Sequence, residues 1–348
     1  MRWTGKNRAG SASEVFPQVG QSGPRTSPER IPSPQAEQQP GAPLVVVLGP
    51  TAIGKTALSI QIAQAVNGEI VSADSRQIYK YMDIGTAKPT PRERAAVPHH
   101  LLDVVTPDET FSLAQYQRAA YQAIEDIHAR NRIPLLVGGT GQYLTAIVEG
   151  WGIPEAPPNV ELREKLEAFA RDHGARALHN RLQDVDPDAA QRIDYRNIRR
   201  VVRALEVYYE TGAPISALQH KTPPPYRILQ IGLTMPREAL YARIDARIDR
   251  MVADGLLDEV RALLQAGYTW ECPAMSGLGY AQWASYLAGE SSLHEAIAAI
   301  RRDTRAFVRR QYTWFHGHDS GIHWLDTTQV TPAAVVELVT SWLSNKGE

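Results

Sequence analysis

The sequence predicts an α/β protein with a P-loop NTPase-like core, in which a parallel sheet is flanked by helices, and an all-helical insertion domain. Three observations predict this fold. A phosphate-binding motif, GPTAIGKT, joins an aliphatic run to an apolar helical pattern within residues 43–64. Strand-like and helix-like segments then alternate, which is typical of parallel sheets. From residue 161 to about residue 212 the pattern is helical without a clear strand, which indicates an insertion.

Buried strands are expected where short aliphatic runs end in a glycine or a polar residue. Those runs cover residues 44–48, 68–74, 133–138, 227–233 and 321–326. Helices are expected where apolar residues recur with a helical period, and Ser112 is a suitable N-cap for the longest early one. Outside the insertion, the helical patterns cover residues 55–66, 112–132, 237–254, 256–265, 280–288, 293–315 and 333–344.

Composition bounds the class of protein. The 348 residues, of which 43% are apolar and 22% charged, can bury one large core or two smaller ones. A formal net charge of −1 gives no global field to attract a polyanion, so any nucleic-acid surface must be local. The single cysteine, Cys272, excludes a disulfide framework and a cysteine zinc site. No apolar run reaches the ~18 residues that span a membrane. We expect a protein of the reducing cytoplasm, consistent with the single cysteine, and a monomer.

Residues 1–42 differ in composition from the rest of the chain. They are rich in Pro, Gln, Ser and Gly and poor in aliphatic residues. Such a segment cannot bury enough apolar surface to offset its ordering entropy, so we expect it to be disordered. A proline-marked boundary, WGIPEAPPNV, begins at Trp151. We therefore divide the remainder into a core of residues 44–150 and 213–345 and a helical insertion of residues 151–212.

The motif GPTAIGKT fits the P-loop pattern GxxxxGK[ST] in full. It comprises Gly49, Pro50, Thr51, Ala52, Ile53, Gly54, Lys55 and Thr56. The two glycines permit the turn, so that backbone N–H groups and a helix N-terminus face an anion. Lys55 can reach outer phosphates, and the Thr56 hydroxyl can ligate Mg²⁺. The motif predicts a phosphate-binding loop without identifying the phosphate compound.

Asp74 ends the second predicted strand and Thr140 follows the third. Ligands of open parallel sheets collect at the carboxyl ends of strands, so both residues and the P-loop should line one cleft. The Asp74 carboxylate could act as a magnesium ligand, as a general base or as a cap of the following turn. The third strand ends in GGTG rather than in the second acidic residue that is expected of a kinase.

Two clusters of arginine stand out although the charges balance overall. Arg196, Arg199, Arg200 and Arg203 share one helix face by their spacing. The second cluster, in RRDTRAFVRRQYTWF at residues 301–315, interleaves arginines with aromatic residues. Such surfaces suit RNA phosphates and unstacked bases. A solvated, ion-paired helix face is the alternative interpretation for either cluster.

Taken together, the chain resembles the bacterial tRNA dimethylallyltransferases, also called tRNA isopentenyltransferases. Nine motifs match in order over residues 44 to about 345: GPTAIGKT, IVSADSRQIYKYMDIGTAKP, VPHHLLDVVTPDETFSLAQYQ, PLLVGGTGQYL, RRVVRALEVY, PREALYARIDARIDRM, GLLDEV, GLGYAQ and RQYTWF. Ile53 stands where this family more often has a small residue, and Gln142 where it often has an apolar one. We expect Ile53 to narrow the loop and Gln142 to alter a channel wall.

The resemblance implies a reaction. The P-loop would hold the diphosphate of dimethylallyl diphosphate with Mg²⁺, and the five-carbon group would move to the exocyclic amino group of the adenosine beside the 3′ end of the anticodon. Adenine and donor would enter one channel from opposite ends. The implied catalytic residues are Asp74, which takes the amino proton, Lys55 and Thr140, and Arg237 would be a second cation on the diphosphate. The implied contacts to the tRNA anticodon stem-loop are Asp74, Ser75, Arg76, Gln77, Thr140, Arg163, Arg199, Arg200 and Arg203.

Two alternatives remain open at this point. One is an adenylate isopentenyltransferase, which would prenylate free adenine nucleotides, or another small-molecule phosphotransferase with a P-loop. The arginine-bearing insertion argues for a macromolecular acceptor, and GGTG argues against a kinase. The other is an RNA-binding module without activity, which the intact Lys55, Thr56 and Asp74 disfavour.

Overall fold

The computed structural model describes residues 41–154, 156, 158–318 and 321–345. The described chain forms two compact units, residues 152–220 and the remainder. The insertion, which we expected to end at residue 212, continues to His220, because a short helix, α9 (Ile215–Leu218), contacts the insertion helices α7 (Pro187–Arg192) and α8 (Ile198–Thr211). Residues 1–40 of the tail predicted to be disordered lie outside the described part.

The larger unit is built on a six-stranded parallel sheet, which confirms the predicted α/β class. Its strand order is β3-β2-β4-β1-β5-β6. The strands are β1 (Pro43–Leu48), β2 (Gly68–Ala73), β3 (His99–His100), β4 (Ile133–Gly138), β5 (Arg227–Thr234) and β6 (Ile322–Asp326). Only β3 was not predicted, because two residues are too short to produce a periodic pattern. Leu48 and Ala73 both pair with Gly138, so three strands end level at one edge.

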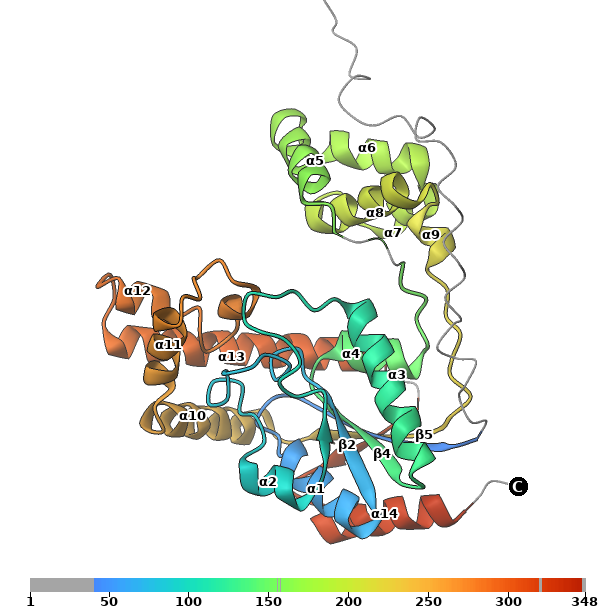
Figure 1. Ribbon diagram of the computed structural model, residues 1–348, viewed down its shortest axis with the longest axis vertical. Coiled ribbons are helices and arrows are strands. Elements are labelled where there is room, and N and C mark those ends of the chain that lie inside the picture. Colours follow the sequence, from blue (N-terminus) through green and yellow to red (C-terminus); the bar gives the residue numbers. More distant parts are fainter. Residues whose placement is uncertain (1–40, 155, 157, 319–320, 346–348) are drawn as a thin grey trace, which may run out of the picture. The chain divides into compact units, whose positions relative to one another are not determined.

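Helices cover both faces of the sheet (Figure 1). Alternate residues of a strand point to opposite faces, and Val45 and Val47 of β1 accordingly pack in a different core cluster from Leu44 and Val46. The first cluster includes residues of α1 (Lys55–Ala65) and α14 (Pro332–Ser344), and the second those of α3 (Leu113–Ala129) and α4 (Gly141–Val148). β1 is therefore buried on both sides, as its continuous aliphatic run predicts.

Further helices complete this unit: α2 (Pro91–Ala96), α10 (Arg237–Ala253), α11 (Leu256–Gln265), α12 (Trp283–Leu287) and α13 (Leu293–His316). Ser112 caps α3 as predicted, with its side chain accepting the N–H of Gln115. α2 was not predicted, although Thr90 and Glu93 form a capping box that the sequence could have revealed. None of the helices in the described part of the chain is long and apolar enough to cross a membrane.

The insertion is a helical bundle (Figure 1), and its helices share one apolar core in the described residues. Its first two helices are α5 (Val160–His173) and α6 (Ala175–Val185), and α7, α8 and α9 follow. Leu166, Leu178, Leu182 and Leu205 are each 0% exposed. The unit therefore has a core of its own.

One carboxylate is buried in this bundle. Glu206 of α8 is 0% exposed and accepts hydrogen bonds from Arg163 Nε (2.7 Å), Arg203 Nη1 (2.6 Å) and the N–H of Asn159 (2.8 Å). Burial alone would raise the pKa of Glu206, but these donors outweigh it and hold the pKa below the ordinary value of 4.5. The charged form of Glu206 therefore stabilises the fold.

We expect Glu206→Gln to lower the free energy of unfolding by about 1–3 kcal/mol, because the variant leaves buried donors without a charged acceptor. The difference in unfolding free energy from wild type should have its full size above pH 4.5. It should disappear as the pH falls through the lowered pKa of Glu206, where the carboxylate becomes protonated. Urea unfolding of the full chain measures it. Glu161→Gln is the control, since Glu161 pairs on the surface with Lys165; equal losses in both variants would contradict the role of Glu206.

Candidate functional site

The loop between β1 and α1 has the shape of an anion-binding site. Gly49 and Gly54 have φ values of 148° and 108°, and Ala52 has a φ of 65°. A Cβ on Gly49 would lie 2.8 Å from the carbonyl oxygen of Leu233, so a side chain does not fit there. α1 begins at Lys55 without a side-chain cap. Its first N–H groups are therefore left to bind a ligand.

Lys55 is held by the loop itself. Its Nζ donates to the carbonyl oxygens of Gly49 (2.9 Å) and Pro50 (2.8 Å). An ammonium group has three donors, so one remains for an anion. Burial lowers the pKa of Lys55 from 10.5 to about 8, while the nearby Asp74 carboxylate opposes the shift. Lys55 is thus charged near neutral pH and loses its proton in mildly alkaline solution.

Asp74 follows β2, and its two carboxylate oxygens have different surroundings. Oδ1 accepts the N–H groups of Arg76 (2.8 Å) and Gln77 (3.4 Å), which is the turn-capping role that the sequence left open. Oδ2 accepts no hydrogen bond from the residues that the structure describes. Asp74 also lines two cavities. One oxygen therefore fixes the turn, and the other is available for chemistry.

The Thr140 hydroxyl joins the ends of β2 and β4. Its Oγ1 accepts the N–H of Ser75 (3.0 Å) and lies 3.3 Å from Ser75 Oγ, to which it donates. The N–H of Thr140 donates to the carbonyl oxygen of Ala73 (3.1 Å). Asp74 and Thr140, which the sequence predicted to share a cleft, therefore lie on one cavity wall together with Ser75.

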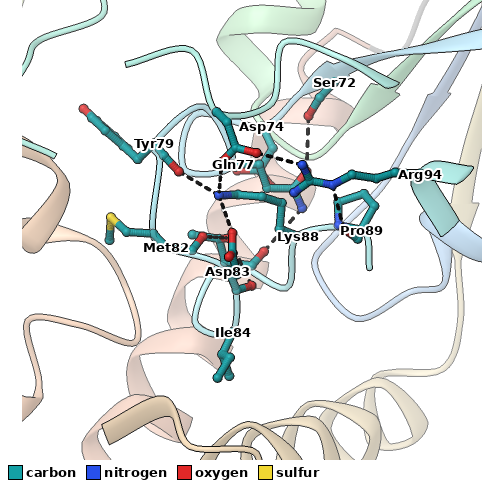
Figure 2. A network of polar contacts seen from close by, with 12 residues as sticks. Ser72, Asp74, Gln77, Tyr79, Met82, Asp83, Ile84, Lys88, Pro89 and Arg94 are labelled. Carbon is teal, nitrogen blue, oxygen red and sulfur yellow. Dashed lines mark hydrogen bonds and ion pairs between the residues drawn. The ribbon is translucent and has the colours of Figure 1, made fainter. Parts of the chain in front are cut away.

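Arg76 and Gln77 make contacts within the protein. Arg76 Nη1 donates to the carbonyl oxygen of Pro273 (3.2 Å). The Gln77 Nε2 donates to the carbonyl oxygens of Thr86 (3.3 Å) and Ala87 (3.2 Å), beside Asp74 (Figure 2). The structure thus gives the Gln77 amide a bridging position to Thr86 and Ala87, whereas the resemblance implied a contact to the tRNA.

Two cavities meet at Lys55 and Asp74. The larger has a volume of about 1060 Å³ and the smaller about 510 Å³. The walls that they share include Thr51, Ala52, Lys55, Asp74, Thr86, Arg247 and Met251. Only the larger is lined by Gly54, Thr56, Arg243 and Arg250, and only the smaller by Ser75, Arg76, Thr140, Phe307 and Gln311. The start of α1 thus opens toward the larger cavity and Thr140 toward the smaller one, while Lys55 and Asp74 face both.

Neither departure from the family pattern changes these walls. Ile53 is 1% exposed, packs in the core cluster of α1 and lines neither cavity. Gln142 is exposed at the start of α4 and lines neither cavity. The expectations that Ile53 narrows the loop and that Gln142 alters a channel wall were wrong, because one side chain points into the core and the other into solvent.

The second cation predicted at Arg237 does not lie on either cavity wall. Arg237 is exposed at the start of α10, and its Nε donates to the Tyr241 hydroxyl (3.1 Å). Arg247 lines both cavities, and the Nη2 of Arg243 lies 3.4 Å from a Cβ built on Gly54. Burial lowers the pKa of Arg247, and Asp74 opposes this shift.

Gln311 of α13 is a site residue that sequence reasoning missed. It is 6% exposed and lines the smaller cavity. Its Oε1 accepts the N–H of Thr51 (3.0 Å) in the P-loop, and its Nε2 donates to the carbonyl oxygen of Gly139 (2.8 Å). One side chain thus fixes the phosphate loop to the end of β4. The motif RQYTWF contained the residue, but its sequence gave no indication of these distant partners.

The predicted RNA-binding arginines of the insertion fall into two groups. Arg163 and Arg203 turn inward to Glu206, as described above. Arg199 and Arg200 are exposed at the start of α8 and form no ion pair with a residue of the described chain. The two groups differ because the buried carboxylate of Glu206 needs positively charged partners, which Arg163 and Arg203 supply. Arg199 and Arg200 lie on the exposed part of α8 and have no buried carboxylate to neutralise.

The second arginine cluster is largely ion-paired. Arg301 and Arg305 of α13 contact Asp249 and Asp245 of α10. Arg302 also pairs with Asp303, so the alternative interpretation of that cluster, an ion-paired helix face, holds for these three residues. Arg310 differs, since it lines the smaller cavity near the Phe307 ring.

Comparisons with known proteins all find the same family of transferases. Residues 77–318 match the family model described as IPP transferase. A tRNA dimethylallyltransferase of Roseiflexus sp. (strain RS-1) is 59% identical over 273 residues, which cover 78% of this chain and 90% of that relative. The tRNA dimethylallyltransferase of Dehalococcoides mccartyi (strain ATCC BAA-2266 / KCTC 15142 / 195) is 48% identical and covers 90% of this chain and 96% of its own.

Solved structures are similar as well. The tRNA isopentenylpyrophosphate transferase of Bacillus halodurans superposes with a TM-score of 0.64 at 41% identity, covering 87% of this chain and 96% of that one. A eukaryotic dimethylallyltransferase, solved as crystallographic snapshots of its action on tRNA, superposes with a TM-score of 0.77 at 29% identity, covering 88% and 81%.

Proposed function

The chain belongs to the IPP transferase family, and from this membership we propose that it transfers a dimethylallyl group from dimethylallyl diphosphate to tRNA. The acceptor is the exocyclic amino group of the adenosine 3′-adjacent to the anticodon, and diphosphate is released. The observation that carries the proposal is that the two cavities share Lys55 of the P-loop and Asp74, whose Oδ2 accepts no hydrogen bond from the described residues. The end of β4 offers Thr140 rather than a second carboxylate.

The larger cavity suits the diphosphate. Backbone N–H groups at the start of α1, the free donor of Lys55, and the guanidinium groups of Arg243 and Arg247 can all face its oxygens. These groups are fixed before the reaction, so they stabilise the charge that develops on the leaving group without a reorganisation cost. Arg243 and Arg247 thus take the role of second cation on the diphosphate, which the resemblance had implied for Arg237.

Mg²⁺ fits this side of the site. The Thr56 hydroxyl lines the larger cavity and is the hard oxygen ligand that Mg²⁺ prefers. The described residues contain no group of three or more His, Cys, Asp or Glu side chains that could hold a metal. The remaining ligands would therefore be diphosphate oxygens and water, and a bound Mg²⁺ would supply further neutralisation of the leaving group.

The acceptor base enters from the smaller cavity. A target base must leave the anticodon-loop stack to reach such a cavity. As the bond between the allylic carbon and the adenine nitrogen forms, the carbon–oxygen bond to diphosphate breaks. The amino proton passes to Asp74 Oδ2, which increases the nucleophilicity of a delocalised amine. Thr140, whose hydroxyl hydrogen is donated to Ser75 Oγ, offers an oxygen lone pair to a donor of the base.

Incubation with labelled dimethylallyl diphosphate tests the function. We expect the label in bulk tRNA, at the adenosine beside the anticodon, and none in AMP. Label in AMP alone would favour the alternative, an adenylate isopentenyltransferase, and transfer of phosphate from ATP would favour a phosphotransferase. Mass spectrometry of the tRNA nucleosides identifies the modified position. The monomeric state predicted from the sequence stays a prediction.

Arg199 and Arg200 provide a separate test of tRNA contact. We expect Arg199→Ala and Arg200→Ala each to weaken tRNA binding and to reduce the slope of log K against log salt by about 1, because each removes a phosphate contact. Titrations of anticodon stem-loop RNA at several salt concentrations measure the slope. Arg237→Ala is the matched control, since this exposed arginine lies in the other unit. An unchanged slope in the α8 variants would show that this face is only solvated.

A further inference from the structure

Residues 83–88 form a wall of the active site although they belong to neither strand end. Gly85 and Thr86 line the smaller cavity, and residues 83, 84, 86, 87 and 88 line the larger one. The segment belongs to the motif DIGTAKP. It has no part in the proposed chemistry, and contacts with other elements hold it in place.

Glu259 of α11 holds this segment through its backbone. Its Oε2 accepts the N–H groups of Asp83 (2.8 Å) and Ile84 (2.7 Å), and its Oε1 accepts the N–H of Gly85 (3.1 Å). The Tyr280 hydroxyl donates to the same Oε1 (2.6 Å). A charged acceptor for three consecutive N–H groups is a strong and directional restraint. Two motifs, GLLDEV and GLGYAQ, thus contribute to one clamp.

Gly85 and Tyr280 fit closely in this clamp. A Cβ on Gly85 would lie 2.5 Å from the Tyr280 ring. Burial raises the pKa of Tyr280 well above its ordinary value, and the Glu259 carboxylate adds to the shift. The phenol therefore stays protonated and remains a donor to Glu259 at all ordinary pH values.

Lys88 holds the other end of the segment (Figure 2). Its side chain is 1% exposed, and its Nζ donates to the carbonyl oxygen of Tyr79 and to carboxylate oxygens of Asp83 and Asp103, each at 2.7 Å. Four non-glycine residues near Lys88 have a positive φ: Tyr81, Ala87, Leu101 and Asp103. Backbone in this region persists only where the surroundings enforce it, and here the surroundings are Lys88 and Glu259.

The segment reaches Asp74 through Gln77. The Gln77 side chain donates to the carbonyl oxygens of Thr86 and Ala87, and the N–H of Gln77 donates to Asp74 Oδ1. A chain of contacts therefore leads from Glu259 through residues 83–87 and Gln77 to the carboxylate. Catalysis is sensitive to such placement, because a displacement of about 1 Å can cost about 100-fold in rate.

We propose that Glu259 is a positioning residue that sets the orientation of Asp74 through residues 83–87 and Gln77. The inference rests on the proposed transfer to tRNA. Glu259 touches neither the described cavities nor the reacting groups. Its effect is therefore on the rate of the bound complex rather than on the affinity for tRNA.

The test is Glu259→Gln, which keeps the shape but turns an NH₂ group toward backbone N–H donors. We expect kcat for transfer to fall about 10- to 100-fold, with the Kd for tRNA within about twofold of wild type. Hydrogen exchange of residues 83–87 should become faster. Asp258→Asn is the matched control, since this neighbour on α11 is exposed and, among the described residues, pairs with Arg261 alone; it should leave both readouts unchanged. Tyr280→Phe, which removes one donor and keeps the ring against Gly85, should give a smaller loss in the same direction.

A double-mutant cycle separates this role from a loss of stability. If Glu259 acts through Gln77, the variant carrying both Glu259→Gln and Gln77→Met should be about as slow as the slower single variant. Multiplied losses, or a wild-type kcat in Glu259→Gln, would overturn the inference. The wild-type reaction is run in parallel, and no transfer by wild type would refute the proposed function instead. Faster exchange without any change in kcat would likewise overturn the link to Asp74.

Discussion

Asp74→Asn is expected to lower kcat for transfer by about 10²–10⁴-fold, which is the usual contribution of a general base. Asparagine keeps a carbonyl oxygen for the N–H groups of Arg76 and Gln77, so the turn after β2 should persist. Its NH₂ group cannot accept the amino proton of adenine at the position of Oδ2. Single-turnover kinetics with saturating donor and tRNA measure the effect.

The choice of asparagine separates the two roles of Asp74. Asp74→Ala removes the turn contacts and the base together, whereas Asp74→Asn removes only the base. We therefore expect Asp74→Asn to match wild type in thermal stability and in Kd for tRNA. A loss of tRNA affinity equal to the loss of rate would argue that Asp74 binds the RNA and takes no proton.

Lys55→Met is expected to lower kcat/KM for dimethylallyl diphosphate by about 10²–10³-fold, the range for removing one fixed donor from a developing anion. Methionine fills the same volume but leaves the carbonyl oxygens of Gly49 and Pro50 without their donor. Steady-state kinetics with varied donor concentration measure the change. The Kd for tRNA is the control and should stay the same.

The pH dependence of the same quantity tests the burial of Lys55. kcat/KM reports on groups of the free enzyme, in which the pKa of Lys55 is about 8. The charged form binds the diphosphate, so kcat/KM for the donor should fall as the pH rises above about 8. This fall should be absent in Lys55→Met. A pH profile shared by both proteins would assign the titration to another group.

Most of the fold could be predicted from the sequence, because its central strands, β1 and β4, are continuous aliphatic runs. β1 illustrates why, since its residues alternate between two cores and leave no polar position to disturb the pattern. β3 could not be predicted, because it exists only through its pairing with β2. The end of the insertion was missed for a similar reason: Ile215 is buried by contacts within the bundle, which a local pattern does not contain.

The site was predictable where a residue's place follows from its position at a strand end. Asp74, Thr140 and the P-loop belong to this class. The resemblance implied Arg237, and Arg243 and Arg247 were missed, because the motif alone does not say which face of α10 meets the loop. Gln77 and Gln311 have hydrogen-bond partners that are distant or backbone groups, and no single sequence specifies such partners.

The most direct test is a crystal structure with an anticodon stem-loop RNA and an unreactive thio-analogue of dimethylallyl diphosphate. We predict that Asp74 Oδ2 lies within hydrogen-bond reach of the exocyclic nitrogen, about 3 Å, with the diphosphate against Lys55 and the first turn of α1. A carboxylate turned away from the base, with no water linking the two, would contradict the account.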